Sequence, residues 1–351
     1  MPNGRRSLST TLKAVLLRPL ELPGVSKMLS SLTDTQTTIF MCHRFSVPEL
    51  GVIGHDGAVL RRCLAHLRKR RYDLLSLQEL FRSLHDGTPL KRAIAFTIDD
   101  GYFDHGQIAA PIFAEFDCPV TTFVATGYID GKSWYWWDKL TYVFERTRRT
   151  ELLARLGDRQ IVYPLDSPGA RSAGSKDLSL RCQDAPEPER LACILETSRE
   201  AEVELPAKPP AQFAPLSWEA ARSLEKRGMT FGPHTVTHPV LSTTSDEQAE
   251  FEMTESWRRL SGEVAQPVPV FCYPSGRARD FGEREMGIVR RMGLLGAVSG
   301  QPGELHPAEF QESPTLPYRV PRFGYSDSLP HVLQCVSGLE TMKSRLRGAS
   351  A

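Results

Sequence analysis

The sequence predicts an α/β fold in the form of a distorted (β/α) barrel of about seven strands with an inserted lid segment. Three observations support this prediction. Apolar runs typical of buried parallel strands alternate with amphipathic helical segments. The chain has 351 residues, a length that one barrel with insertions can fill. The residues best suited to chemistry directly follow apolar runs, as expected at the strand ends of a barrel.

The composition is that of an ordinary folded protein. Hydrophobic residues make up 40% of the chain and charged residues 24%, which provides enough apolar surface to offset chain entropy. Lysine and arginine total 43 against 42 for aspartate and glutamate, so there is no broad positive field and we expect no nucleic-acid partner. The seven cysteines are scattered without metal-ligand spacing, which indicates buried thiols in a reducing compartment.

Residues 1–37 form a leader ahead of the first predicted strand. Its apolar residues recur at roughly helical spacing beside basic ones, a pattern that fits either a helix on a membrane surface or one packed on the domain. The leader has no signal-peptide cleavage pattern, and no run of about 18 uncharged apolar residues occurs in the chain. We therefore expect a cytoplasmic protein, with peripheral contact at the inner membrane as a further expectation.

The first part of the barrel is expected over residues 38–130. Segment 59–67 carries apolar residues at helical spacing, whereas 93–98 is a continuous apolar run that ends in two acids. In chain order, this part is predicted as strand 38–42, helix 59–67, strand 93–98, helix 108–116 and strand 119–125.

The alternation breaks over residues 131–212, which we interpret as an insertion or lid. Its aromatic run, Trp134 to Trp137, would either pack inside the insertion or offer faces for sugar rings or lipid, and Trp136 is our candidate for contact with a saccharide. A helix is expected over about 142–156. The stretch 166–190 is rich in Pro, Ser, Gly and charge, and no regular element is predicted there.

The alternation returns over residues 213–325, the second part of the barrel, and residues 326–351 form a C-terminal tail. Ser217 is the expected N-cap of the first helix in this part. The predicted elements are helix 218–227, strand 229–231, helix 247–260, strand 268–273, helix 283–292, strand 294–298 and a closing strand 318–323.

Two motifs carry chemistry. Asp99 and Asp100 are adjacent carboxylates at the end of an apolar strand, and Gly101 permits the chain to turn there. Crowded acids repel each other unless a cation is near. His234 and His238 follow a later strand, and two imidazoles with one carboxylate would leave open positions on a divalent metal ion. Taken singly, Asp-Asp-Gly is often a plain turn, and two histidines at this spacing also occur by chance on exposed helices.

Together these motifs resemble the polysaccharide deacetylase family, the NodB-homology group of carbohydrate esterases. Its Thr-Phe-Asp-Asp-Gly motif is matched by Thr97 to Gly101 with Ile98 in place of Phe, and its His-Ser/Thr-x-x-His motif by His234 to His238. The resemblance spans about residues 38–130 and 213–323. It implies a NodB-like barrel in which Asp99 is the catalytic base and Asp100, His234 and His238 bind one divalent ion. Zinc is the first expectation, and Co, Ni or Mn can use the same ligands.

A third element, Phe271 to Gly276, resembles the family's Arg-x-Pro-Tyr motif only in part. Cys272 stands where many members have Arg, and Ser275 stands where they have Tyr. The resemblance implies that the Ser275 backbone N–H contacts the oxyanion. Arg322 is our candidate to replace the lost guanidinium, although a plain salt bridge on a barrel strand would also explain it. Tyr273 is expected to contact the substrate.

The family's general acid is a His in a late Leu-x-His motif, and we identify no such motif in this chain, so the acid is assigned to no residue. His306 lies in a loop-like region and is either recruited for this purpose or merely exposed. His43 follows the first strand and either lines the site or is a hydrogen-bonded structural residue.

The resulting hypothesis is a metal-dependent hydrolase that removes an N-acetyl, or an N-formyl, group from a saccharide. Its substrate would belong to bacterial exopolysaccharide or glycolipid biosynthesis and could be lipid-linked. Two alternatives stay open. One is carbohydrate O-deacetylation, because an oxygen leaving group needs less protonation than an amine. The other is a catalytically silent saccharide-binding module that retains the metal.

Overall fold

The computed structural model of the protein describes residues 37–337 and residue 339. The leader with its predicted amphipathic helix and most of the C-terminal tail lie outside these residues. Within the described part, no helix is long and apolar enough to cross a membrane.

The centre of the fold is a parallel sheet. Its strands have the order β10-β1-β3-β4-β7, and the short β2 also pairs with β3. Each pairing is parallel, as expected for apolar strands separated by helices. The strands are β1 (Thr37–Cys42), β2 (Asp73–Leu74), β3 (Ala93–Ile98), β4 (Val120–Val124), β7 (Met229–Pro233) and β10 (Phe323–Gly324).

Two further strands continue the sheet toward a ring. β8 (Val270–Cys272) and β9 (Gly296–Val298) pair in parallel with each other. An isolated parallel bridge joins Phe231 of β7 to Pro267 just before β8, and another joins Val298 of β9 to Val320 just before β10. The predicted α/β fold is therefore confirmed, and the ring is distorted: regular hydrogen bonding stops between β7 and β8 and between β9 and β10.

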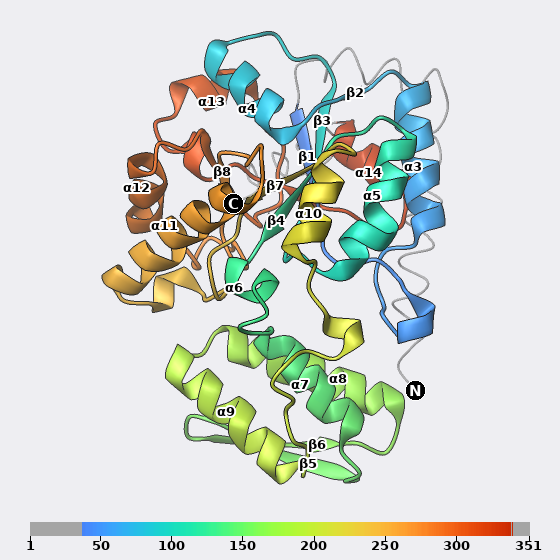
Figure 1. Ribbon diagram of the computed structural model, residues 1–351, viewed down its shortest axis with the longest axis vertical. Helices are drawn as coiled ribbons and strands as arrows, with labels where there is room; N and C mark the ends of the chain where they lie inside the picture. Colours follow the sequence, from blue (N-terminus) through green and yellow to red (C-terminus); the bar gives the residue numbers. More distant parts are fainter. Residues whose placement is uncertain (1–36, 338, 340–351) are drawn as a thin grey trace, which may run out of the picture.

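Helices cover both faces of the sheet (Figure 1). One group packs with the sheet over a core that includes Phe96 and Phe113. The first group contains α3 (Gly57–Lys69), α5 (Ala110–Glu115), α10 (Trp218–Glu225) and α14 (Leu329–Val336), and the second contains α4 (Leu77–Asp86), α11 (Asp246–Glu263), α12 (Glu283–Arg291) and α13 (Pro307–Glu312). In the second group, α4 and α13 pack around Phe81 and Phe123, and α11 and α12 pack around Phe271.

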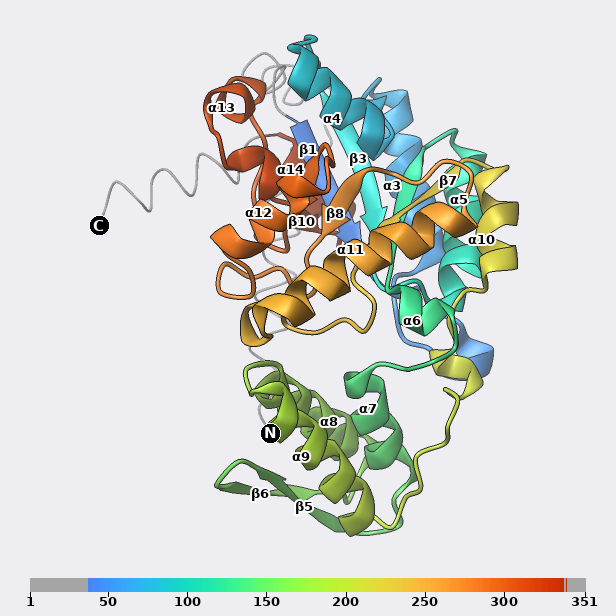
Figure 2. The same ribbon diagram turned by 60° about the vertical axis from the view of Figure 1, so that its left-hand side comes forward.

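The chain between β4 and α10 builds a separate layer at the carboxyl ends of the strands (Figures 1 and 2). After the short α6 (Thr126–Ile129), it forms α7 (Trp136–Arg146), an antiparallel hairpin of β5 (Glu151–Leu156) and β6 (Arg159–Pro164), then α8 (Pro168–Gln183) and α9 (Glu187–Glu200). This layer has its own apolar core, which includes Phe144, Leu152, Leu178 and Ile194. It lies beside the edge of the sheet where the chemical motifs are found.

Two predictions for this layer were wrong. The expected helix over 142–156 ends at Arg146, because residues 151–156 bury alternate side chains and turn back through the two-residue loop Gly157–Asp158 as a hairpin. The stretch 166–190, expected to be irregular, is mostly helical. Pro168 begins α8 behind the Ser167 cap, and Gly174 lets the helix lie against Phe144, where an added Cβ would be 2.8 Å from the ring.

Two barrel elements also differ from the prediction. The expected closing strand 318–323 is mostly irregular: Leu316–Tyr318 is a 3₁₀ turn, Pro321 has no N–H to donate, and only Phe323–Gly324 pairs as β10. The expected helix over 108–116 begins as a π-helical segment, His105–Ala109, which continues into α5.

Candidate metal centre and active site

The turn after β3 separates the two adjacent carboxylates. Asp100 has a φ of 86° and Gly101 a φ of 85°, so the chain reverses through two residues in the left-handed region. The Asp99 side chain then points toward Arg322, and the Asp100 side chain points toward His234 and His238. The predicted turn thus gives the two acids different surroundings.

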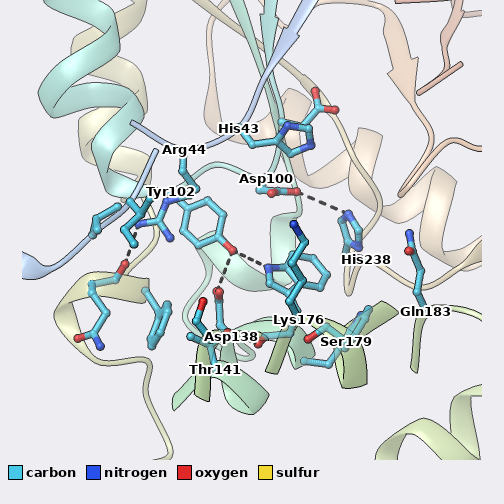
Figure 3. A pocket seen from close by; sticks show the side chains of 18 of the residues that line it. His43, Arg44, Asp100, Tyr102, Asp138, Thr141, Lys176, Ser179, Gln183 and His238 are labelled. Carbon is cyan, nitrogen blue, oxygen red and sulfur yellow. Dashed lines mark hydrogen bonds and ion pairs between the residues drawn. The ribbon is translucent and has the colours of Figure 1, made fainter. Parts of the chain in front are cut away.

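Asp100, His234 and His238 form a compact, buried set of possible metal ligands. The Asp100 Oδ1 atom lies 3.7 Å from His234 Nε2 and 3.6 Å from His238 Nε2. One ligand atom from each residue falls within 4.8 Å of the others. Figure 3 shows Asp100 and His238 facing each other across one end of a cavity.

The chemical state of these three groups fits a divalent cation. The His234 Nδ1–H donates to the Cys272 carbonyl at 2.7 Å, which leaves the Nε2 lone pair directed at the site. Burial lowers the pKa of His234 to about 4 and that of His238 well below its usual value, so both imidazoles are neutral. Burial, followed by the nearby Asp99 charge, raises the pKa of Asp100. A cation bound between them would restore the Asp100 carboxylate and use both lone pairs.

The loop that carries both histidines is held by one buried acid of α11. Thr235 and His238 have φ values of 67° and 61°, which are uncommon for residues other than glycine. The Glu252 carboxylate accepts hydrogen bonds from the Val236 and Thr237 backbone N–H groups at 2.8 Å and from the Thr237 hydroxyl at 2.6 Å. Sequence reasoning missed Glu252, whose only signal was an acid on the buried face of a predicted helix.

Asp99 is bound by the guanidinium of Arg322. The two carboxylate oxygens accept from Arg322 Nη1 and Nη2, each at 2.8 Å. Burial alone would raise the pKa of Asp99, but the Arg322 charge outweighs burial and holds this pKa well below its ordinary range. Arg322 also lies 3.2 Å from the Cys272 sulfur. The small Cys272 side chain thus leaves space for a guanidinium that arrives from a later part of the chain.

A second set of possible metal ligands, Asp99, His234 and Cys272, lies beside the first. Its chemistry is less suitable. Burial raises the pKa of the Cys272 thiol, whereas metal binding needs the thiolate. The facing side of Asp99 is already occupied by Arg322. Asp100, His234 and His238 are therefore the more suitable candidate ligands for a metal ion.

Of the two site residues predicted in the segment after β8, Ser275 lines the cavity and Tyr273 does not. Ser275 has a φ of 60° and lines the cavity, and its backbone N–H donates to no other described residue. Tyr273, expected to contact substrate, instead points into the core. Its ring stacks on Phe281 at 4.0 Å and its hydroxyl donates to the Tyr318 carbonyl at 2.9 Å. Successive side chains of a strand point to opposite sides, which turns Tyr273 away from the cavity.

The aromatic run is divided between the core and the cavity. Trp134 and Tyr135 are buried, and the Tyr135 hydroxyl donates to the Asp100 carbonyl at 2.6 Å. Trp136 and Trp137 line the cavity. The Trp137 ring stacks on Tyr135 and meets the His238 ring with centroids 4.8 Å apart. Two members of the run therefore lie in the core, and two line the cavity.

The cavity has a volume of about 710 Å³ and is lined from both layers of the protein. Strand ends of the barrel contribute Asp99, Asp100 and Ser275, together with the histidine loop. The opposite wall consists of α7 and α8, which present mostly polar side chains such as Asp138, Lys176 and others seen in Figure 3. A cavity of this size can accept a small organic ligand.

The histidines outside the two metal motifs lie in different places. His43 lines the cavity at the end of β1, and its backbone carbonyl is 2.5 Å from His105 Nε2. His306 is the N-cap of α13 and lies beside Glu304. The preceding residue, Leu305, pairs with Thr37 at the start of β1, whereas the cavity lies at the end of β1, so His306 is remote from the cavity. The sequence Leu329-Pro330-His331 has Leu-x-His spacing that the sequence reading overlooked, but it begins α14, which packs on α3 outside the cavity.

Comparison with known proteins confirms the resemblance. The family model for polysaccharide deacetylase matches residues 170–294, a range that contains both histidines and Ser275 but not the adjacent aspartates. No curated protein matches the chain in sequence.

Two solved structures have similar folds. The Streptococcus pyogenes deacetylase PplD, solved in complex with acetate, is 18% identical, with a TM-score of 0.53 over 87% of this chain and 99% of that chain. IcaB from Ammonifex degensii is 15% identical, with a TM-score of 0.52 over 86% of this chain and 97% of that one. At these identities the comparison establishes a shared fold.

Proposed function

We propose that this chain, whose residues 170–294 match the polysaccharide deacetylase family, is a metal-dependent hydrolase that removes an N-acetyl group from a saccharide. The observation that carries the proposal is the arrangement of Asp100, His234 and His238 within 4.8 Å of one another. A separate carboxylate, Asp99, opens into the same cavity. The three ligand candidates can hold a cation while the Asp99 carboxylate accepts a proton.

One bound divalent ion, held by Asp100, His234 and His238, would polarise the acyl carbonyl and lower the pKa of water. Zinc suits this ligand set, and Co, Ni or Mn are compatible with it. Glu252 and the Cys272 carbonyl would fix the directions of the two histidines, because each holds part of the loop or ring that carries a ligand atom.

Asp99 accepts a proton from the attacking water in this proposal. Its lowered pKa keeps it ionised at neutral pH, as a proton acceptor must be. The water oxygen bonds to the acyl carbon, and the Ser275 backbone N–H stabilises the charge that develops on the former carbonyl oxygen. Arg322 holds the Asp99 carboxylate in place through two hydrogen bonds.

His43 is the proposed proton donor to the leaving nitrogen. The bond between the acyl carbon and nitrogen breaks as nitrogen takes this proton, so that acetate and a free amine leave. Part of His43 is open to the cavity. Burial among the atoms at the base of the cavity lowers its pKa, against the opposing charge of Asp99, so His43 is neutral at pH 7 and takes up a proton before it donates one.

The substrate is proposed to be a saccharide of bacterial exopolysaccharide or glycolipid assembly. The polar wall of α7 and α8 supports a sugar substrate, and Trp136 offers an aromatic face to a ring. A lipid-linked substrate, a cytoplasmic location and peripheral contact with the inner membrane belong to this proposal as expectations. Fractionation of cells tests the location.

The proposal is tested by acetate release from matched N-acetyl and O-acetyl saccharides, with wild type and Asp99→Asn compared at equal metal content. We expect N-acetyl hydrolysis by wild type and a loss of at least about a hundredfold in the variant. Preferential hydrolysis of the O-acetyl substrate would replace the N-deacetylase assignment with the O-deacetylase one. Tight saccharide binding without any acetate release would instead favour the silent binding module.

A further inference from the structure

Lys176 is a basic residue of the cavity wall for which the proposed chemistry has no use. Its side chain extends from α8 into the cavity, toward the end that holds Asp100 and His238 (Figure 3). No carboxylate among the described residues forms an ion pair with it. Arg44, the other long basic side chain that lines the cavity, is already bound to Asp104 at 2.9 Å and to the Gln212 carbonyl at 2.7 Å.

The packing of α8 fixes this orientation. Gly174 lies against the Phe144 ring, Leu178 is fully buried, and Ser175 Oγ is 3.1 Å from Thr141 Oγ1 of α7. With this face against α7, the helical repeat places the remaining face toward the cavity. Its members are Ser172, Lys176, Ser179, Leu180 and Gln183. Lys176 is therefore the cationic member of a stripe that is otherwise neutral.

The two acids of α7 that line the cavity do not neutralise the positive charge of Lys176. Asp138 and Glu145 of α7 line the same cavity. Burial raises the pKa of Asp138 to about 7, and burial also raises the pKa of Glu145. The Asp138 carboxyl additionally accepts a hydrogen bond from the Tyr102 hydroxyl at 2.8 Å. Neither acid is paired with Lys176, so the ammonium stays available to a ligand.

We propose that Lys176 binds an anionic substituent of the saccharide, either a sugar carboxylate or a phosphate, while the acyl group lies at Asp100. This inference rests on the proposed function and makes Lys176 a residue that determines specificity. An ammonium group contacts carboxylate and phosphate oxygens equally well, because it acts as a compact point charge with three donors. The simpler interpretation is a lysine that is merely solvated inside an open cavity, and the two predict different binding results.

The test compares wild type, Lys176→Met and Lys176→Arg in calorimetric binding of three N-acetylated saccharides: a neutral one, one with a uronate and one with a phosphate monoester. Lys208→Met, which changes a lysine outside the cavity, is the matched control. For an anionic ligand we expect Kd to rise about ten- to a hundredfold in Lys176→Met, as for loss of a hydrogen bond to a charged group. Lys176→Arg should retain most of the affinity, and the neutral ligand should change by less than about twofold.

The ligand that wild type binds more tightly, uronate or phosphate, identifies the anion. The inference would be overturned by equal losses for neutral and anionic ligands in Lys176→Met. It would also be overturned if wild type bound neither anionic saccharide more tightly than the neutral one. Acetate release is measured on the same samples. Because the inference is read from Kd, a protein that binds anionic saccharides through Lys176 but releases no acetate would refute the proposed hydrolysis while leaving this inference intact.

Discussion

Replacing Arg322 with Met should strongly destabilise the protein, because it leaves the Asp99 carboxylate buried without its partner. Arg322 and Asp99 are about 1% and 3% exposed and share two hydrogen bonds of 2.8 Å. At about 1.5–3 kcal/mol for each hydrogen bond to a charged group, the pair accounts for roughly 3–6 kcal/mol. Removing one partner of a buried pair typically costs about 3–5 kcal/mol. We therefore expect a loss of about 4 kcal/mol.

The assay is urea unfolding of wild type, Arg322→Met, Asp99→Asn and the double variant at pH 7. Arg279→Met is the matched control, because Arg279 makes an exposed ion pair with Asp184 and its loss should cost at most about 1 kcal/mol. The double variant should lose about 2 kcal/mol less unfolding free energy than the two single variants lose together. The reasoning would be refuted if Arg322→Met lost less than about 1 kcal/mol of unfolding free energy. It would also be refuted if the losses of the two single variants simply added up in the double variant.

Three further predictions concern other parts of the structure. Glu252→Ala should weaken zinc binding about ten- to a hundredfold in a chelator competition, because the histidine loop loses its acceptor, and an unchanged affinity would contradict this positioning role. Tyr273→Phe should cost about 1 kcal/mol in thermal unfolding and leave KM unchanged, whereas a raised KM would return Tyr273 to the substrate site. Asp130→Asn should cost about 1 kcal/mol above pH 4, allowing for solvent screening. Burial raises the pKa of Asp130, but hydrogen bonds led by that from Arg259 lower it to about 2, so the difference from wild type should vanish as pH falls from 4 through 2, and a difference that persists there would count against the pairing.

The sequence predicted those elements whose apolar pattern was unbroken. β3 is an almost continuous apolar run, β4 is rich in β-branched and aromatic residues, and α3 buries its residues at helical spacing, so these elements were found close to their observed bounds. The helices of the insertion were harder to predict from the sequence. α8 packs through Gly174 and Ser175, and small residues of this kind in a helix resemble the composition of a loop.

The metal-ligand candidates could be predicted because Asp100 and the loop with His234 and His238 come after strands, and parallel strands bring their carboxyl ends together. The surroundings could not be predicted in the same way. The contact of Arg322 with Asp99 joins residues 223 positions apart, and its cue was only the missing Arg at Cys272. Tyr273 was misassigned because the resemblance supplied a motif but not the side to which its side chain points. Lys176 lies in a segment for which no helix was expected, so its face toward the cavity had no sequence signal.

The central claim is tested most directly by acetate release from N-acetylated oligosaccharides with protein stripped of metal and the same protein reloaded with one equivalent of zinc. The uronate- and phosphate-bearing saccharides used for Lys176 belong in the substrate panel. We predict no release without metal, restored release after reloading, and no restoration in Asp100→Ala. Equal release by stripped and reloaded protein, or full activity of Asp100→Ala, would contradict the account.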